Sequence, residues 1–202
     1  MADTPCPFET FSSLALPNIR AAFIQRAPGV EVLADRQIAL DRLKSIHLST
    51  MEKAGFAGMP LAQAEQVHSA HVRIVTKSTP FPVPDCDALV TTEAGLCLGI
   101  YVADCAAVYL ADKYGRGIAL AHSGRKGTEL GIVTQTIETL CKTIGAIPSD
   151  IILRDDAIMD EGGEESVGLD VGASILDLSA GHHSKIPEDF NYVIVVLRHE
   201  VY

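Results

Sequence analysis

The chain has 202 residues, of which 48% are hydrophobic and 21% are charged, as in an ordinary globular protein with a sizeable core. Its formal net charge of −10 repels polyanions, which argues against a general binder of nucleic acid or of anionic membranes. A local basic site for a small phosphate or nucleoside remains compatible with this charge.

The five cysteines are odd in number, and no two of them are spaced as C-x-x-C. This is not the pattern of a disulfide framework, and it favours a reducing compartment. The first twenty residues lack the basic and apolar regions of a signal peptide, and the apolar runs are too short to span a bilayer. We therefore expect a cytoplasmic protein.

The first third of the chain predicts a strand followed by a helix. The strand is IRAAFIQ at 19–25. The helix is expected from about Ala34 to Ala54, because apolar residues recur there at helical spacing, namely Ala39, Leu43 and Ile46.

The segment QVHSAHVRIVTK, residues 66–77, predicts a strand with a polar entrance. Alternate residues from Ala70 to Ile74 share one face by the two-residue period of a strand. If the strand reaches back to His68, this histidine points inward with that face and His71 points outward.

The middle of the chain predicts two more strands and the clearest helix. The strands are CDALVTT at 86–92 and GLCLGIYVA at 95–103. The helix is Thr128–Ile144, whose apolar stripe includes Cys141. We therefore expect Cys141 to be a core residue without chemistry.

The last third carries an acidic run and a closing strand. The run at 155–165 is expected to be a solvated loop, with a calcium site as the weaker alternative because EF-hand ligand spacing is missing. A short helix is expected at 171–179. NYVIVVLRH at 191–199 is nearly continuous in apolar residues and predicts a buried strand.

Residues 102–128, VADCAAVYLADKYGRGIALAHSGRKGT, predict a β-hairpin with metal-capable side chains at its open end. If Ala107 faces His122, then Cys105 is a diagonal neighbour of His122 on the same face. A register shifted by two residues would put Cys105 directly opposite His122. A shift by one would separate them onto opposite faces.

His68 is the candidate for a third ligand beside Cys105 and His122. Two histidines and one cysteine suit a borderline-soft ion such as Zn²⁺ and leave a fourth position for water or substrate. That is the stoichiometry of a catalytic site, since structural zinc sites are normally closed by four protein ligands. The alternative is a cysteine in the core and a histidine bonded to backbone at a strand end.

The loop SGRKGT, residues 123–128, leads from the predicted strand into a helix. Gly124 and Gly127 free the backbone, while Arg125 and Lys126 bring positive charge to the helix N-terminus, a place that attracts anions. We expect these four residues to bind substrate or phosphate. A simple exposed basic loop is the alternative.

Three stretches carry a family resemblance: QVHSAHV, DALVTTEAGLCLGIYVADCAAVYLAD and GIALAHSGRKGTELGIVTQTIETL. With the ordered motifs QVH, ADC and AHxGxxGT, the chain resembles the laccase-domain family over about residues 62–152. This family is also called the multicopper polyphenol oxidase, purine nucleoside phosphorylase or peptidoglycan editing factor family.

The resemblance implies that His68, Cys105 and His122 bind one zinc ion. It also implies a single α+β domain over 1–202, with mixed β-sheets layered between flanking helices in α/β/β/α order. The implied activity is that of an enzyme on purine nucleosides, by phosphorolysis of adenosine or inosine or by deamination. Copper is less favoured, because several coppers need many histidines and the chain has seven.

Three further residues are candidates for the site. Arg26, in FIQRAPGV, matches the arginine of the family's F-x-x-R-x-GG-V segment and would meet phosphate or a developing anion. Asp104 is expected to orient a ligand or a water, or else to be a turn residue at a strand entry. Asp87, in DALVT, is the weaker candidate, with a turn cap as the alternative.

The chain departs from the family after His122. The family pattern HAGWRGT reads HSGRKGT here, so Arg125 replaces a tryptophan and Lys126 replaces an arginine. The family's serine- and arginine-rich C-terminal motif is not recognisable. Three alternatives to a nucleoside enzyme therefore stand: a catalytically silent metal-binding relative, a metal-free cysteine hydrolase with Cys105 as nucleophile and His122 as base, and a copper-dependent phenol oxidase.

Overall fold

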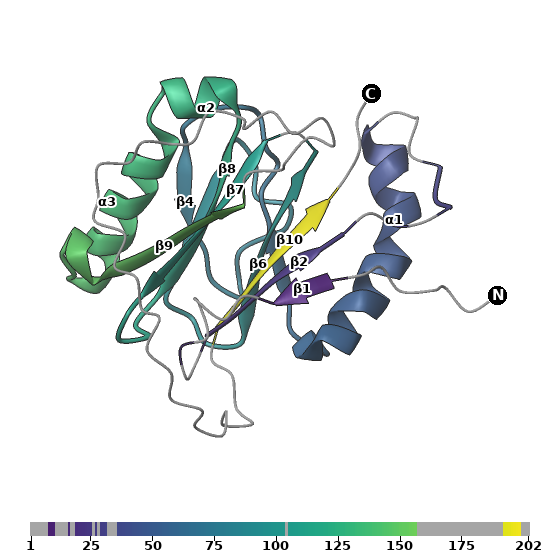
Figure 1. Ribbon diagram of the computed structural model, residues 1–202, viewed down its shortest axis with the longest axis horizontal. Helices are drawn as coiled ribbons and strands as arrows, with labels where there is room; N and C mark the ends of the chain where they lie inside the picture. The colour runs from purple at the N-terminus through teal and green to yellow at the C-terminus, as the bar shows by residue number, and fades with distance from the viewer. Residues whose placement is uncertain are drawn as a thin grey trace.

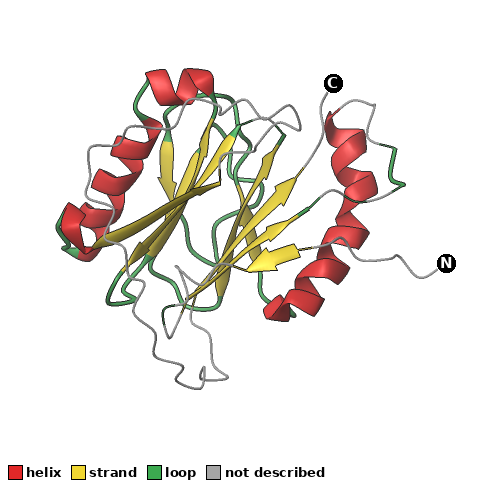
Figure 2. Ribbon diagram, viewed as in Figure 1, coloured by secondary structure: helices red, strands yellow, loops and turns green. Residues whose placement is uncertain are grey.

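A computed structural model describes residues 8–10, 16, 19–25, 27, 29–31, 36–103, 105–156 and 192–198. Two five-stranded β-sheets pack face to face, and helices cover the outer side of each (Figures 1 and 2). This layering confirms the predicted α+β fold class with mixed sheets between flanking helices. Within the described part of the chain, no helix combines the length and apolar character that crossing a bilayer requires.

The first sheet has the strand order β1-β2-β10-β6-β3. Its strands are β1 (Phe8–Thr10), β2 (Ile19–Ile24), β10 (Tyr192–Arg198), β6 (Leu96–Val102) and β3 (Leu61–Gln63). The strands predicted at 19–25, 95–103 and 191–199 are thereby confirmed. β10 pairs in parallel with both β2 and β6, so the closing strand lies at the centre of this sheet.

The second sheet has the strand order β4-β5-β8-β7-β9. Its strands are β4 (Val72–Ile74), β5 (Ala88–Thr91), β8 (Ile118–Ser123), β7 (Ala106–Asp112) and β9 (Ile151–Asp156). β7 and β8 form the predicted hairpin, with Ala107 opposite His122, so the expected register is confirmed. β9 takes in the first two residues of the acidic run at 155–165, which was expected to be a loop throughout.

Helix α1 (Arg36–Met51) covers the first sheet, and α3 (Ile132–Ile144) covers the second (Figure 1). Three short helices also lie in the described part of the chain: η2 (Glu52–Phe56), α2 (Arg125–Glu129) and η3 (Pro148–Asp150). The prediction of one helix over Thr128–Ile144 is wrong at its start, because Gly131, with a φ of 76°, separates α2 from α3. Cys141 is buried, as predicted.

The core between the sheets is built from alternate residues of facing strands. On β8, Ile118 and Leu120 are fully buried in this core, while Ala119 and Ala121 pack with the residues under α3. The two-residue period makes His122 the next residue to point between the sheets. The rest of the acidic run after Asp156, and the helix expected at 171–179, lie outside the described residues.

Candidate metal centre

His68, Cys105 and His122 converge at one end of the core between the sheets. One ligand atom from each residue, the cysteine sulfur and a ring nitrogen of each histidine, lies within 4.8 Å of the others. The two imidazole rings are nearly perpendicular, with centroids 5.1 Å apart. The same donors around a tetrahedral zinc would be about 3.3–3.6 Å apart, so a contraction of about 1 Å would suffice to close on an ion.

Cys105 and His122 meet because of the hairpin and the strand before it. Cys105 lies in the short connection from β6, in the first sheet, to β7, in the second sheet. His122 is near the end of β8, opposite Ala107, and only 5% of its surface is exposed. Cys105 is half-buried and His68 is exposed, so the cluster opens to solvent on the His68 side.

His68 reaches the cluster from a loop and not from a strand. β4 begins only at Val72, so the strand predicted over 66–77 is too long, and strand parity does not explain the direction of His68. Gln66 and His68 instead have φ values of 61° and 58°, in the left-handed region that non-glycine residues rarely adopt. An outward His71 was expected, and this residue is indeed exposed.

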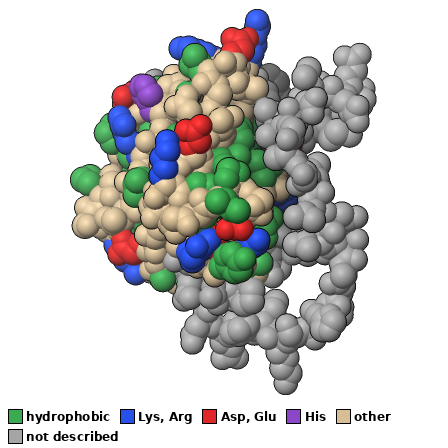
Figure 3. Space-filling model, turned by 90° about the vertical axis from the view of Figure 1, so that its left-hand side faces the viewer, with side chains coloured by type: hydrophobic (Ala, Val, Ile, Leu, Met, Phe, Trp, Pro, Cys, Tyr) green, Lys and Arg blue, Asp and Glu red, His purple; other side chains and the backbone are tan. Residues whose placement is uncertain are grey.

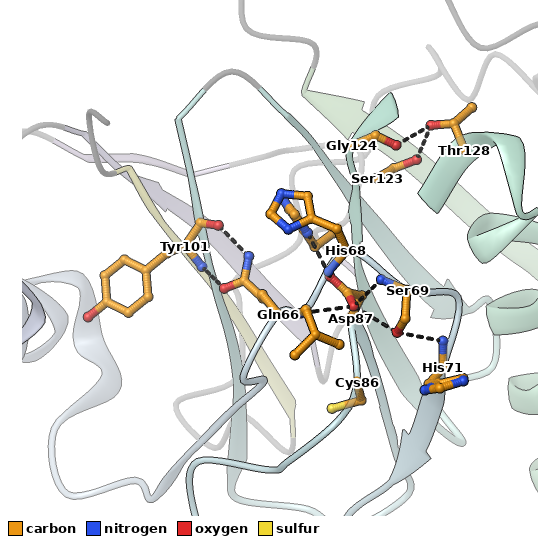
Figure 4. A network of polar contacts seen from close by, with 12 residues as sticks. Gln66, His68, Ser69, His71, Cys86, Asp87, Tyr101, Ser123, Gly124 and Thr128 are labelled. Carbon is orange, nitrogen blue, oxygen red and sulfur yellow. Dashed lines mark hydrogen bonds and ion pairs between the residues drawn. The ribbon is translucent and has the colours of Figure 1, made fainter. Parts of the chain in front are cut away.

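Gln66 ties this loop to the first sheet. Its side chain is almost fully buried, and its Nε2 donates to the carbonyl oxygen of Tyr101 at 2.6 Å. The backbone N–H of Tyr101 donates to Oε1 of Gln66 at 2.8 Å. Tyr101 belongs to β6, four residues before Cys105, so one amide joins the backbone segments that lead to two of the three clustered side chains (Figure 4).

Asp87 ties the same loop to the second sheet. Its fully buried carboxylate accepts hydrogen bonds from the backbone N–H groups of Val67, His68 and Ser69 and from the hydroxyl of Ser69 (Figure 4). Its Oδ1 also lies 2.9 Å from Nδ1 of His122. Burial by itself raises the pKa of Asp87, but the hydrogen bonds from His122 and Ser69 outweigh it and lower the pKa to about 2.

The sequence identified Asp87 only as a weak candidate, because its partner is distant in the chain. β5 and β8 pair antiparallel with Ala88 opposite Ala121, so the next position places Asp87 opposite His122. The backbone N–H of His122 also donates to the carbonyl oxygen of Asp87 at 2.8 Å. Asp87 was expected to be either a site residue or a turn cap, and its contacts fit both roles. Its carboxylate caps the turn at 67–69 and also contacts the proposed ligand His122.

Two glycines let α2 approach the cluster closely. A Cβ atom at Gly124 would lie 2.8 Å from Sγ of Cys105 and 3.5 Å from Cδ2 of His68. A Cβ atom at Gly127 would lie 3.3 Å from the carbonyl oxygen of Ser69. The glycines of the SGRKGT loop are therefore explained by packing around the proposed ligands, whether or not the loop also binds an anion.

The basic residues of this loop lie on the outer surface of α2. Arg125 is 94% exposed, and its Nε donates to Oε1 of Glu129 at 3.3 Å. On the side of the molecule that carries α3, basic and acidic side chains are interspersed in this way (Figure 3). Lys126 is also exposed, while Arg26 and Asp104 lie outside the described residues. The roles of all four in binding or catalysis stay predictions.

The other described cysteines are buried and are not members of this cluster. Burial raises the pKa of Cys86 to about 11 and that of Cys97 to about 12, and it also raises the pKa of Cys141. These thiols stay protonated at neutral pH and are unsuited to nucleophilic or metal chemistry. No disulfide joins any of the four cysteines that the structure describes.

Two curated relatives match part of the chain. A purine nucleoside phosphorylase of Streptomyces coelicolor is 41% identical over 92 residues, which are 44% of this chain and 37% of that protein. A purine nucleoside phosphorylase of Corynebacterium glutamicum is 43% identical over 89 residues, which are 43% of this chain and 36% of that protein. The similarity thus spans well under half of each relative.

The fold also has a solved counterpart. The crystal structure of YlmD from Geobacillus stearothermophilus matches with a TM-score of 0.53 and 27% identity, over 74% of this chain and 54% of YlmD. The family model for the multi-copper polyphenol oxidoreductase laccase matches residues 40–154, which include every member of the His–Cys–His cluster and its Asp87 support. With this match over more than half of its length, the chain belongs to that laccase-like family.

Proposed function

We propose that the chain is a zinc-dependent enzyme acting on purine nucleosides, by phosphorolysis, by deamination or by both. The observation that carries this proposal is the convergence of His68, Cys105 and His122 at a solvent-accessible end of the core. The relatives named purine nucleoside phosphorylase support the substrate class, although they match only part of the chain.

The donor set suits zinc. Two imidazole nitrogens and one thiolate sulfur are borderline-soft ligands, and three of them leave one coordination position for water or substrate. When bound there, the ion would polarise a substrate oxygen or lower the pKa of a water. Within the described residues, one group of three or more potential ligands is found, which favours a single ion over the several coppers in the family's description.

Four further residues that the sequence singled out would supply the remaining functions. In phosphorolysis, a phosphate oxygen bonds to C1′ of the ribose while the bond from C1′ to the purine nitrogen breaks, and the purine leaves with a proton. We assign phosphate binding to Arg26, Arg125 and Lys126, and the orientation of a ligand or water to Asp104. A cytoplasmic location, with its reducing conditions, is part of this proposal, and it agrees with the absence of a disulfide among the four described cysteines.

A metal-free cysteine hydrolase is the second candidate, and one contact favours it. Nδ1 of His122 lies 2.9 Å from Asp87, as in catalytic triads in which a carboxylate orients a histidine base. In this alternative, Cys105 is the nucleophile and His122 accepts its proton.

Metal content separates the two candidates. The zinc proposal requires about one zinc per purified chain, lost in Cys105→Ser, which elemental analysis would measure. Turnover of adenosine and inosine by the zinc-loaded protein, with and without phosphate, then tests the nucleoside activity. Zinc-loaded protein that turns over no nucleoside would contradict the proposed reaction and favour a silent metal-binding relative. Protein that binds no zinc would favour the hydrolase.

A further inference from the structure

We propose that Asp87 is a positioning residue that holds both histidine ligands of the metal centre through one buried carboxylate. The inference rests on the metal binding proposed above, and it concerns a residue outside the ligand set. Its basis is that five hydrogen-bond donors, from two segments of the chain that carry the two histidines, converge on this side chain.

The two carboxylate oxygens divide these donors between them. Oδ1 accepts from the N–H of His68 at 3.0 Å and lies 2.9 Å from Nδ1 of His122. Oδ2 accepts from the N–H groups of Val67 and Ser69 at 3.2 and 2.7 Å, and from the hydroxyl of Ser69 at 2.9 Å. Because donors face both oxygens, the position requires a group that only accepts, and an ionised carboxylate is such a group.

On the His122 side, this contact selects the ring nitrogen that faces the cluster. An ionised Asp87 accepts the proton of Nδ1, so the neutral ring keeps its lone pair on Nε2. A carboxylate partner also fixes the orientation of a metal-bound imidazole and makes it a better ligand. The ring and the backbone N–H of His122 are both held by Asp87, so this ligand has little freedom to turn away.

On the His68 side, the carboxylate holds an uncommon backbone conformation. His68 has a φ of 58°, and three successive N–H groups, at 67–69, turn toward one anion. Backbone N–H groups gathered in this way form a site for negative charge. Without that charge the three donors would lose their common acceptor, and the loop would relax and carry His68 away from Cys105.

The charges of the centre agree with this role. Metal binding would require Cys105 as a thiolate and both histidines as neutral imidazoles, so that the cysteine and the Asp87 carboxylate would bring two negative charges. A divalent cation neutralises this set, while the carboxylate itself is saturated by donors and does not need to bind the ion.

Asp87→Asn tests the proposal with little change in volume. The amide keeps one acceptor but presents an NH₂ group to donors at the other position. We expect the dissociation constant for Zn²⁺, measured on the full chain by competition with a chromophoric chelator, to rise about 10–100-fold. Asp112→Asn is the matched control, because Asp112 is as fully buried as Asp87 but its carboxylate pairs with Arg116. We expect the zinc affinity of this variant to stay within about threefold of wild type.

A second measurement needs no variant. In ¹⁵N NMR of the zinc-loaded wild-type protein, we expect His122 to carry its proton on Nδ1, with slow exchange, and to bind zinc through Nε2. Wild-type zinc affinity in Asp87→Asn, zinc bound through Nδ1 of His122, or no zinc binding by the wild-type protein would each overturn the inference. Absence of nucleoside turnover with normal zinc binding would contradict the proposed reaction alone.

Discussion

Gly124 shows how closely the proposed ligands are packed. A Cβ atom at this position would lie 2.8 Å from Sγ of Cys105, closer than real contacts allow, while its φ of −81° is ordinary for alanine. Gly124→Ala should therefore displace the proposed ligands without straining the local backbone. We expect about a tenfold loss of zinc affinity in a chelator competition assay, with an unchanged far-UV circular dichroism spectrum.

Gly131→Ala provides the contrasting case. A Cβ atom there has no neighbour within 4 Å, but the φ of 76° strains any side chain. This variant should lose about 1–2 kcal/mol of unfolding free energy and keep its zinc affinity. Equal losses of zinc affinity in both variants would show that general destabilisation, and not contact with Cys105, explains the effect.

The sequence predicted all three proposed ligands, but the physical basis differs between the hairpin residues and His68. Cys105 and His122 follow from the hairpin, where local alternation and a short turn set the register. His68 was identified correctly as part of the cluster, but the strand expected to carry it begins only at Val72. Its backbone N–H donates to Asp87, and that contact needs β4 beside β5, a pairing that no local pattern specifies.

Two carboxylates hold the β7–β8 turn at the end opposite the proposed metal centre: the buried Asp112, and Asp150, which pairs with Lys113 and Arg116. Asp112 accepts two hydrogen bonds from the guanidinium of Arg116 and two more from the N–H groups of Tyr114 and Arg116. The hydrogen bonds from Arg116 outweigh burial and hold the pKa of Asp112 below its usual value.

Asp112→Asn should therefore change the pH dependence of stability. A carboxyl whose pKa is lowered by folding stabilises the fold fully above its unfolded pKa of about 3.9, and this stabilisation is lost as pH falls through the lower folded pKa. We expect Asp112→Asn to cost about 1.5–3 kcal/mol at pH 7, and the difference from wild type to shrink below about pH 4. Urea denaturation at pH 7 and pH 3 measures both values.

An exposed carboxylate supplies the control for this turn. Glu138 pairs with Lys142 on α3, and both side chains are largely exposed. Glu138→Gln removes the same charge but should change stability by less than about 0.5 kcal/mol at either pH. A pH-independent cost in Asp112→Asn would mean that shape, and not the charge of the carboxylate, stabilises the turn.

At the level of elements, the sequence predicted which segments form strands and helices more accurately than it predicted where these elements begin and end. The apolar stripe of Ile132–Ile144 was sufficient to identify α3. The predicted helix was extended too far toward the N-terminus, through Gly131, where the backbone turns. The strand order within each sheet could not be predicted, because β10 pairs with β2 and β6 across more than 80 residues of chain. Such pairings depend on packing between whole layers.

For the whole molecule, the proposed metal centre is a junction between the two sheets. Cys105 lies in the connection from one sheet to the other, and His122 ends a strand of the second sheet. The loop of His68 is tied to the first sheet by Gln66 and to the second by Asp87. An ion bound there would join three segments that come together only in the folded chain.

Removing the metal should therefore destabilise the folded chain as a unit. A ligand that binds only the folded state adds about 4 kcal/mol when its free concentration is 1,000 times its dissociation constant, which corresponds to a rise in Tm of about 8–16 °C for a chain of this size. We expect EDTA to lower the Tm of zinc-loaded wild-type protein by this amount in calorimetry, and to leave the Tm of Cys105→Ser almost unchanged. A similar EDTA effect on both proteins would place the stabilising ion elsewhere. No effect on the wild type would mean that His68, Cys105 and His122 do not hold an ion that joins the sheets.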